Sequence, residues 1–141
     1  QNENVLGLDI RAVSKGTIEV QPNWSCEPDV VGSYADMPFQ DQSFSLVLWD
    51  IPHKLKWDSG LITTKYGYLG EEWKETTAAG FKECWRVLKP GGTLIFKWCD
   101  LDVKVSTMLN LFPIQPIAGT VTKKGVNQTY FIIFHKGSKH D

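Results

Sequence analysis

The sequence predicts an α/β fold in which a mostly parallel sheet ends in an antiparallel hairpin. Three observations support this prediction. The apolar runs at 44–50 and 93–98 are too short to be helices, a segment of clear helical periodicity separates them, and two strand-like segments follow one another at the carboxyl end. Alternating strands and helices are typical of parallel sheets, and adjacent strands joined by a short turn are typical of hairpins.

The composition is that of one ordinary globular domain. The chain has 141 residues, of which 42% are hydrophobic and 22% charged, and we place a single domain at 1–136 and a disordered tail at 137–141. No apolar run approaches the roughly 20 residues of a membrane helix, and no signal peptide is visible. The three cysteines form no CxxC motif and no Cys/His cluster, so neither a zinc site nor a disulfide framework is predicted. We expect a cytoplasmic protein.

The net charge of −1 conceals a mild asymmetry along the chain. Residues 1–70 carry five basic and nine acidic side chains, whereas residues 71–141 carry ten basic and seven acidic ones. This distribution permits a surface that faces nucleic acid without demanding one.

Three strand-like segments make up the first part of the chain. Residues 4–11 (NVLGLDIR) predict a short strand, and residues 29–39 (DVVGSYADMPF) begin as a strand that breaks at Met37-Pro38. The run FSLVLWD at 44–50 is apolar almost throughout, which predicts a strand buried on both faces. Residues 53–70 then form a long polar and aromatic loop, and loops of this length in a compact domain are usually functional.

The second part contains the strongest helix signal. Apolar residues recur every three to four positions over 71–88, which predicts a helix, and the KPGG sequence at 89–92 ends it. A buried strand is predicted at 93–98, followed by a second helix at 100–112 with Asp100 as its N-cap.

The last two strand-like segments, 117–123 and 128–136, are expected to pair as an antiparallel hairpin. Lys123 and Lys124 lie at its turn, where a solvated position is the default and contact with phosphate is the alternative.

Three stretches stand in a characteristic order: DMPFQDQSFSLVLWDIPH at 36–53, FKECWRVLKPGGTLIFKW at 81–98, and the terminal hairpin. Together they resemble the class I S-adenosylmethionine-dependent methyltransferases. The resemblance covers about residues 5–136. It implies a Rossmann-like sheet with helices on both faces and S-adenosyl-L-methionine as the cofactor.

The tetrad Asp50-Ile51-Pro52-His53 resembles the (D/N)PP(Y/F/W) motif of amino-methyltransferases that act on adenine or cytosine. The tetrad followed by KYG, a Trp-containing helix, RVLKPGG and IFKW is closer still to small bacterial and phage proteins of the DPPH type, which are assigned as DNA methyltransferases. This resemblance implies nucleic acid as the partner, with DNA favoured over RNA. It also implies the cytoplasm of a bacterium or of a phage-infected cell as the location.

The sequence departs from the family pattern at three places. Ile51 replaces the first proline of the motif, and Ser33 stands where an acid commonly ends the third strand. The first strand and its glycine-rich loop, which hold the methionine part of the cofactor in these enzymes, have no counterpart before residue 5. That strand lies at the centre of the family's sheet, so its absence would leave two central strand edges unpaired, which a folded domain should not do.

Three explanations for the missing strand are open. Residues upstream of Gln1 could supply it, another chain could supply it, or residues 4–11 could take the central position themselves. The last explanation conflicts with TIEVQP at 17–22, which follows too soon for a parallel crossover. We expect the first explanation to hold, because Gln1 is not a natural start.

The tetrad offers the groups that methyl transfer to an aryl amine requires. Aryl amines are poor nucleophiles, so an enzyme must hold the NH2 between acceptors and an in-line methyl group. Asp50 and the carbonyl of Ile51 would accept the two N–H groups, while Pro52 keeps the turn rigid. His53 would stack on a flipped base or accept a proton. The alternative is a plain strand end followed by a turn.

Further candidate residues follow from the resemblance. Asp9 corresponds to the acid that binds the ribose hydroxyls, and Asp36 and Met37 would flank the adenine. The cofactor set is Asp9, Ile10, Asp36, Met37 and Asp50. The substrate set combines the basic and aromatic loop with the end of the strand at 93–98, and consists of Lys54, Trp57, Lys65, Tyr66, Lys97 and Trp98. The structural alternatives are capping acids, a core methionine and a core tryptophan.

Three functions are therefore compatible with the sequence. The first is a methyltransferase acting on an exocyclic amino group in nucleic acid, which the tetrad favours. The second is a methyltransferase of the same fold that acts on a small molecule or a protein. The third is a degenerate cofactor-binding module without activity, which Ile51, Ser33 and the missing glycine loop favour.

Overall fold

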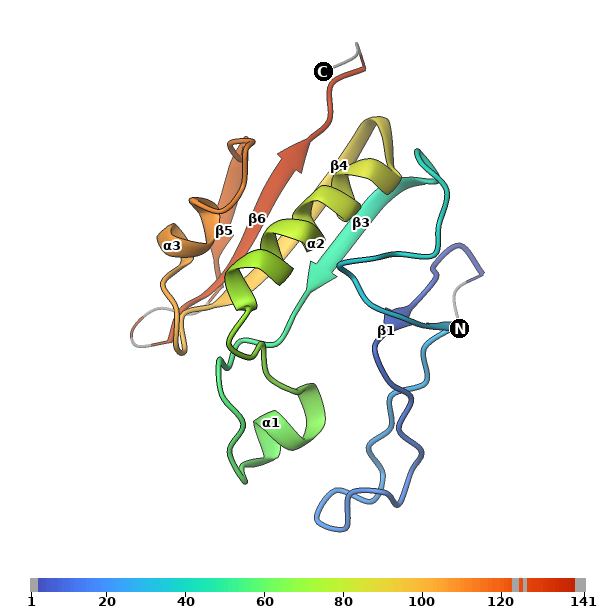
Figure 1. Cartoon of the computed structure of the whole chain (residues 1–141), viewed down its shortest axis with the longest axis vertical. Coiled ribbons are helices and arrows are strands. Elements are labelled where there is room, and N and C mark those ends of the chain that lie inside the picture. Colours follow the sequence, from blue (N-terminus) through green and yellow to red (C-terminus); the bar gives the residue numbers. More distant parts are fainter. Residues whose placement is uncertain (1–2, 123–124, 126, 139–141) are drawn as a thin grey trace.

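A four-stranded sheet forms the centre of the molecule. The computed structural model describes residues 3–122, 125 and 127–138. In it, β3 (Phe44–Asp50) pairs in parallel with β4 (Leu88–Cys99). The remaining pairs are antiparallel: β4 with β6 (Thr129–His135), and β6 with β5 (Ala118–Val121) at the far edge (Figure 1). The terminal hairpin predicted from the sequence is confirmed, while Lys123 and Lys124 and the last three residues of the tail lie outside the described residues.

A second, two-stranded sheet lies beyond the outer edge of β3 (Figure 1). It consists of β1 (Leu8–Asp9) and β2 (Val30–Val31), which pair in parallel. No ladder joins β1 to β3 among the described residues. The explanation in which residues 4–11 take the central position is therefore wrong, because β1 does not pair with β3.

One face of the four-stranded sheet carries the core. Helix α2 (Trp73–Val87) crosses this face over β3 and β4 and buries Thr77, Phe81 and Cys84 against it (Figure 1). The short helix α3 (Val105–Leu109) adds Met108 to the same cluster. Gly80 allows α2 to approach closely, because a Cβ there would lie 2.6 Å from the Trp49 ring.

Three predictions about the sheet are not confirmed. The four-stranded sheet contains one parallel and two antiparallel pairings, so it is mixed rather than mostly parallel. The prediction that 44–50 is buried on both faces is wrong, since Leu46 and Leu48 are 58% and 62% exposed. Alternation along the strand directs Val47 and Trp49 towards α2 and the two leucines to the opposite face. Helices on both faces are likewise not confirmed, because α2 and α3 contribute to the same core.

The helix predicted at 71–88 is confirmed as α2, which ends at Val87. The KPGG sequence lies within β4 instead of before it, with Gly91 at a φ of 79° where a side chain would be strained. The helix predicted at 100–112 is reduced to α3, and Lys104 occupies its N-cap position. Asp100 still contributes, because its Oδ1 accepts the Val105 N–H at 2.7 Å.

The segment predicted as a loop at 53–70 contains a short helix, α1 (Leu61–Tyr66). Its start is held by Asp58, whose Oδ1 accepts bonds from the Thr63 hydroxyl at 2.6 Å and the Gly60 N–H at 2.9 Å. Gly67 ends it at a φ of 79°, a left-handed conformation that glycine adopts without strain.

Among the described residues, no helix is long and apolar enough to cross a membrane. The described part of the chain also contains no group of three or more His, Cys, Asp or Glu side chains arranged to hold a metal ion.

Candidate active site

The tetrad lies where β3 ends. Asp50 is the last residue of the strand, Ile51 is 4% exposed, and Pro52 follows without an N–H to extend the pairing with β4. Asp50 stands opposite Lys97 in the register between β3 and β4. The strand therefore carries a carboxylate to its carboxyl end and anchors the following turn through a buried isoleucine.

Both oxygens of the Asp50 carboxylate face a basic side chain. Lys97 Nζ donates to Oδ2 at 2.8 Å, and His53 Nε2 lies 3.4 Å from Oδ1. Partial burial alone would raise the pKa of Asp50, but nearby His53 and the bond and charge of Lys97 outweigh burial and lower it. Asp50 is therefore an ionised acceptor at neutral pH.

The His53 side chain lies between Asp50 and Trp98 and contacts both. Its ring meets the Trp98 ring edge-on, with centroids 5.1 Å apart and an interplanar angle of 73°. Trp98 is 0% exposed, and its Nε1–H donates to the carbonyl of Val103 at 2.8 Å. The structure thus places Trp98 in the core, where it supports His53 and presents no surface to a substrate. Lys97, predicted beside it for the substrate, contacts Asp50 instead.

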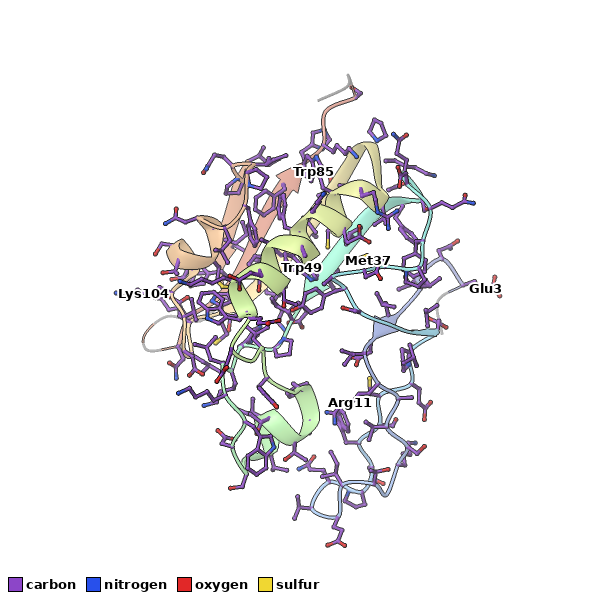
Figure 2. The ribbon with its side chains drawn as sticks, viewed as in Figure 1. Glu3, Arg11, Met37, Trp49, Trp85 and Lys104 are labelled. Atoms are coloured by element: carbon purple, nitrogen blue, oxygen red, sulfur yellow. The ribbon has the colours of Figure 1, made fainter. Side chains whose placement is uncertain are left out.

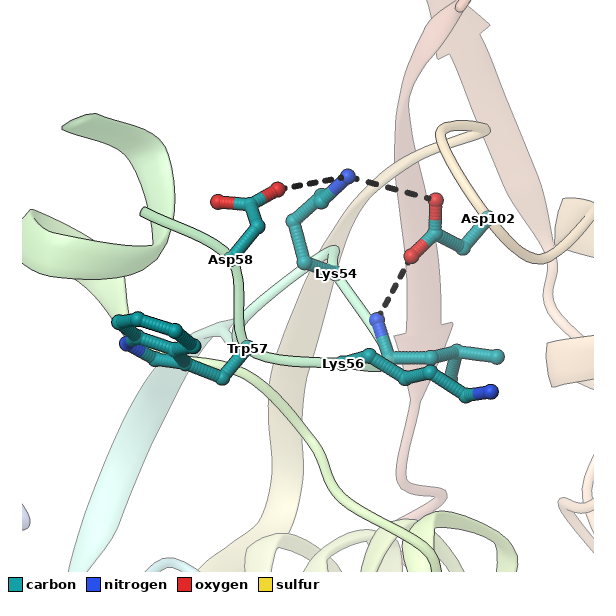
Figure 3. Close-up of a pocket in the computed structure, with 6 residues that line it drawn as sticks. Lys54, Lys56, Trp57, Asp58 and Asp102 are labelled. Carbon is teal, nitrogen blue, oxygen red and sulfur yellow. Dashed lines mark hydrogen bonds and ion pairs between the residues drawn. The ribbon is translucent and has the colours of Figure 1, made fainter. Parts of the chain in front are cut away.

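A shallow pocket opens on the loop behind the tetrad (Figure 3). Lys54 lies between two acids there, with Nζ 3.3 Å from Asp58 Oδ2 and 3.8 Å from Asp102 Oδ1. The Leu55 N–H donates to the other oxygen of Asp102 at 2.8 Å. The charge of Lys54 is therefore balanced within the protein, which the sequence did not predict because Asp102 lies far along the chain. Trp57 lines the same pocket and is 64% exposed.

The residues predicted for the cofactor's ribose lie on the other sheet. Asp9 ends β1 and is half-buried, and its Oδ1 accepts the Arg11 N–H at 3.1 Å. Ile10 follows with 72% of its surface exposed. A carboxylate at a strand end could accept the two hydroxyls of a ribose, and an exposed apolar side chain next to it could pack against an adenine ring. Among the described residues we assign none to the amino-acid part of the cofactor.

Asp36 and Met37, predicted for the adenine, lie on the loop between β2 and β3. Helix α2 holds this loop in place at Met37, which is labelled in Figure 2. Asp36 is exposed and Met37 half-buried. The Met37 N–H donates to Glu83 Oε2 at 2.8 Å, and the Met37 carbonyl accepts from Arg86 Nη2 at 3.1 Å. Glu83 and Arg86 were missed by the sequence reasoning, although an acid and an arginine three residues apart on a helix are a visible signal.

Arg86 uses every one of its N–H groups in this network. Besides Met37, it donates to the Phe39 carbonyl and to Asp41 from Nη1 at 2.7 and 2.8 Å, and to Glu83 from Nε and Nη2 at 2.7 and 2.8 Å. The hydrogen bond from Arg86 is the main reason that the pKa of Glu83 is lowered. The backbone of the 37–41 loop is therefore fixed to the last turns of α2.

Solved structures show what fold this arrangement belongs to. The PH0226 protein from Pyrococcus horikoshii matches with a TM-score of 0.54 and 16% identity over 76% of this chain and 58% of its own length. TTHA0409 from Thermus thermophilus, a suggested DNA modification methylase, matches with a TM-score of 0.52 and 15% identity over 97% of this chain and 55% of its own length. Its complex with S-adenosyl-L-methionine matches with a TM-score of 0.50 and 16% identity.

The chain has the fold of these proteins. It spans only 55–58% of their length. No family model and no curated protein matches the sequence. At these identities the comparisons establish the mixed α/β fold, while the roles of individual residues stay predictions.

Proposed function

We propose that this protein is an S-adenosyl-L-methionine-dependent methyltransferase. Its substrate is an exocyclic amino group of adenine or cytosine in nucleic acid, and DNA is favoured over RNA. The observation that carries the proposal is the Asp50 carboxylate, held ionised at the end of β3 by Lys97 and His53. The fold shared with TTHA0409, which has been solved with S-adenosyl-L-methionine, supports the choice of cofactor.

Asp50 binds the amino group. A carboxylate has about four lone-pair positions, so a single bond from Lys97 leaves room to accept an N–H of the substrate. The carbonyl of Ile51 accepts the second N–H, and the buried Ile51 side chain together with Pro52 fixes its direction. Holding both N–H groups turns the nitrogen lone pair away from the ring system and towards the methyl donor.

His53 receives the proton that the amine releases. S-adenosyl-L-methionine supplies an electrophilic methyl group, so the nitrogen gains a methyl and must lose one proton. His53 Nε2 lies 3.4 Å from Asp50 Oδ1 and takes up this proton beside the carboxylate. Its ring, supported by Trp98, also offers a face on which a base can stack.

In this proposal, residues from both sheets bind the cofactor. Asp9 accepts the ribose hydroxyls, and Ile10 and Met37 contact the adenine, with Asp36 as its polar neighbour. Asp50 lies at the methyl end. The hydrogen bonds of Glu83 and Arg86 to Met37 keep the loop that carries Asp36 and Met37 in one conformation.

The test is transfer of a tritiated methyl group from S-adenosyl-L-methionine to DNA and RNA oligonucleotides by the full-length protein, with the modified base identified. Asp50→Ala should abolish transfer, and the matched variant Glu75→Ala, which removes an acid from the first turn of α2, should not. Transfer to a small molecule or protein only, or full activity in Asp50→Ala, would contradict the proposal.

One observation favours a second candidate, a cofactor-binding module without activity. Both oxygens of Asp50 already face a basic side chain, so a substrate amine must share the carboxylate with Lys97 and His53. Binding of S-adenosyl-L-methionine by calorimetry, combined with no methyl transfer to any substrate, is the outcome this candidate predicts.

A further inference from the structure

Two segments of the chain meet beyond the carboxyl ends of β1 and β3. The first, residues 11–28, follows β1 as an irregular hairpin with a bridge between Val13 and Cys26. The second is α1 with its flanking loop. Arg11 lies between them (Figure 2), and its Nη2 donates bonds of 2.7 Å to the carbonyls of Thr64 and Lys65. These charged bonds join the first segment to the last turn of α1.

Aromatic rings from both segments meet at this junction. The rings of Trp24 and Tyr66 lie 6.2 Å apart at an interplanar angle of 89°. Lys65 Nζ lies 5.5 Å from the centre of the Trp24 ring and 5.4 Å from that of Tyr66, close enough to interact with both. Tyr66 is 58% exposed and Trp24 is half-buried, so the pair presents ring surface to solvent. We call Arg11, Trp24, Lys65 and Tyr66 the Trp24 platform.

The platform is attached to the tetrad. Gly67, which ends α1, lies so close to Pro52 that a Cβ on it would be 3.8 Å from Pro52 Cγ. The Leu69 N–H then donates to the Lys54 carbonyl at 2.9 Å, so the chain leaving α1 runs back along the turn that follows the tetrad. The end of α1, which carries Lys65 and Tyr66, is therefore held close to Pro52 of the tetrad.

The charge of the first segment, residues 11–28, points to bases more than to phosphates. Residues 11–28 contain two basic side chains, Arg11 and Lys15, and two acidic ones, Glu19 and Glu27. Lys54 on the neighbouring loop is already balanced by Asp58 and Asp102. A duplex presents mainly its phosphates and needs a strongly basic surface, whereas unpaired bases stack on aromatic rings with little demand for charge.

We propose that the Trp24 platform is a stacking surface for unpaired bases of a nucleic acid strand, beside the amino-binding tetrad. Trp24 and Tyr66 contact the bases, while Arg11 and Lys65 hold the two rings in position. This inference rests on the proposed function, because it identifies the part of the substrate that flanks the target base.

The first test is fluorescence anisotropy of a labelled single-stranded DNA oligonucleotide with the full-length protein. Trp24→Ala should weaken binding by about fivefold or more, which corresponds to the loss of one base–aromatic stack. Trp24→Phe, which retains a ring, should bind nearly as the parent does. The control is Trp85→Ala, since Trp85 also has a lysine over its ring, Lys136 Nζ at 5.8 Å, but lies on α2. It should bind as the parent does.

The second test is photochemical cross-linking of an oligonucleotide that carries 5-iodouracil, with the modified peptides identified by mass spectrometry. Cross-links at Trp24 or Tyr66 are expected. Cross-links only elsewhere, unchanged affinity in Trp24→Ala, or tighter binding of the duplex than of the single strand would overturn the inference. If Trp24→Ala fails to fold, as judged by circular dichroism, the cross-links and the preference of the parent protein for single strands still test the inference.

A methyl-transfer assay on the same preparations separates this inference from the proposed function. Methyl transfer to nucleic acid with no effect of Trp24→Ala and no cross-link at the platform rejects the platform alone. Single-strand binding that depends on Trp24 without any methyl transfer rejects the proposed reaction alone.

Discussion

The two faces of the four-stranded sheet come from the same strands and differ sharply in exposure. Towards α2, Trp49, Phe96 and Phe134 are 4%, 0% and 0% exposed. On the opposite face, Leu46 and Leu48 are 58% and 62% exposed. Because neighbouring residues of a strand point to opposite faces, β3 contributes to both. An apolar strand can therefore be buried on either face, and the helices that pack on the sheet decide which face is buried.

The candidate site lies at one end of this exposed face. The register places Leu48 beside Ile95 and Ile133 in one row, and Asp50 beside Lys97 in the next row of that face. The Asp50–Lys97 ion pair thus lies at the end of an exposed apolar surface, next to the edge of β3 that has no partner strand among the described residues. The core on the α2 side gives this pair a rigid base.

The largest effect is expected where the covered face is densest. Phe81 is 1% exposed, and its ring centroid lies 4.5 Å from that of Phe112 and 5.2 Å from that of Phe134. Phe81→Ala should lower the free energy of unfolding by about 3–5 kcal/mol, measured by urea denaturation. Lys82→Ala, at the exposed neighbouring position, should change it by less than about 0.5 kcal/mol. Similar losses in both variants would remove the distinction between covered and exposed positions.

A smaller loss is expected where α2 comes closest to the sheet. A Cβ on Gly80 would lie 2.5 Å from Tyr34 Cδ2 and 2.6 Å from Trp49 Cζ2, inside the contact distance of ring atoms. Gly80→Ala should therefore destabilise the protein by about 1–3 kcal/mol through overpacking, despite the better helix propensity of alanine. A rise in melting temperature in this variant would show that α2 stands further from β3 than the structure has it.

On the exposed face, the Asp50–Lys97 ion pair should affect the pKa of Asp50 more than it affects the free energy of unfolding. Replacing Lys97 by methionine removes one cause of the lowered pKa of Asp50, so the pKa should rise in a carboxyl NMR titration. Because Asp50 is 43% exposed, the loss of stability should stay below about 1 kcal/mol. The control is Lys54→Met, which removes a partner of Asp58 and should leave the pKa of Asp50 unchanged.

The same pair predicts a direction of pH dependence. The pKa of Asp50 is lowered in the folded protein from an ordinary value of 3.8. The stabilisation from its ionised form is therefore present above that ordinary value and is lost as the pH falls through the lowered folded-state pKa. Stability measured from neutral to acidic pH should show this loss in the parent, and a smaller one in Lys97→Met. An equal pH dependence in the two proteins would contradict the role of Lys97.

The smallest effect is expected at the exposed leucines. Leu48→Ser should change the free energy of unfolding by less than about 0.5 kcal/mol, since the side chain is already 62% exposed, and it should improve solubility. A loss comparable to that of Phe81→Ala would show that this face is covered in solution. Sedimentation velocity on the parent and the variant would then reveal whether a second copy covers it.

The elements predicted best from the sequence are those with their own periodic signal. The strand at 44–50 and the helix over 71–88 are found as β3 and α2, and the terminal hairpin is found as β5 and β6. Helix α1 was missed because its six residues depend on the hydrogen bonds of Asp58 to Gly60 and Thr63 and on a left-handed Gly67, and not on an apolar stripe. The helix at 100–112 was overestimated, because the spacing of its apolar residues did not reveal that the regular turns begin only at Val105.

The candidate site was predicted in part for the same reason. The tetrad could be recognised because its four residues are contiguous and follow a strand. The partners that define its chemistry are distant in sequence: Lys97 for Asp50, Trp98 for His53, and Asp102 for Lys54. The exposure of Trp98 could not be predicted, because a tryptophan at a strand end is equally compatible with a core and with a binding surface.

By itself, the sequence determined β3, α2 and the terminal hairpin, and that an acid ends β3 and a proline and a histidine come after it. Short-range periodicity and the missing N–H of proline act within a few residues, so they can be read locally. Only the tertiary structure decided that one face of β3 is exposed, that Lys97 and His53 hold Asp50 ionised, and that Trp24 meets Tyr66. These outcomes depend on which distant segments pack together, and burial and charge pairing are properties of that packing.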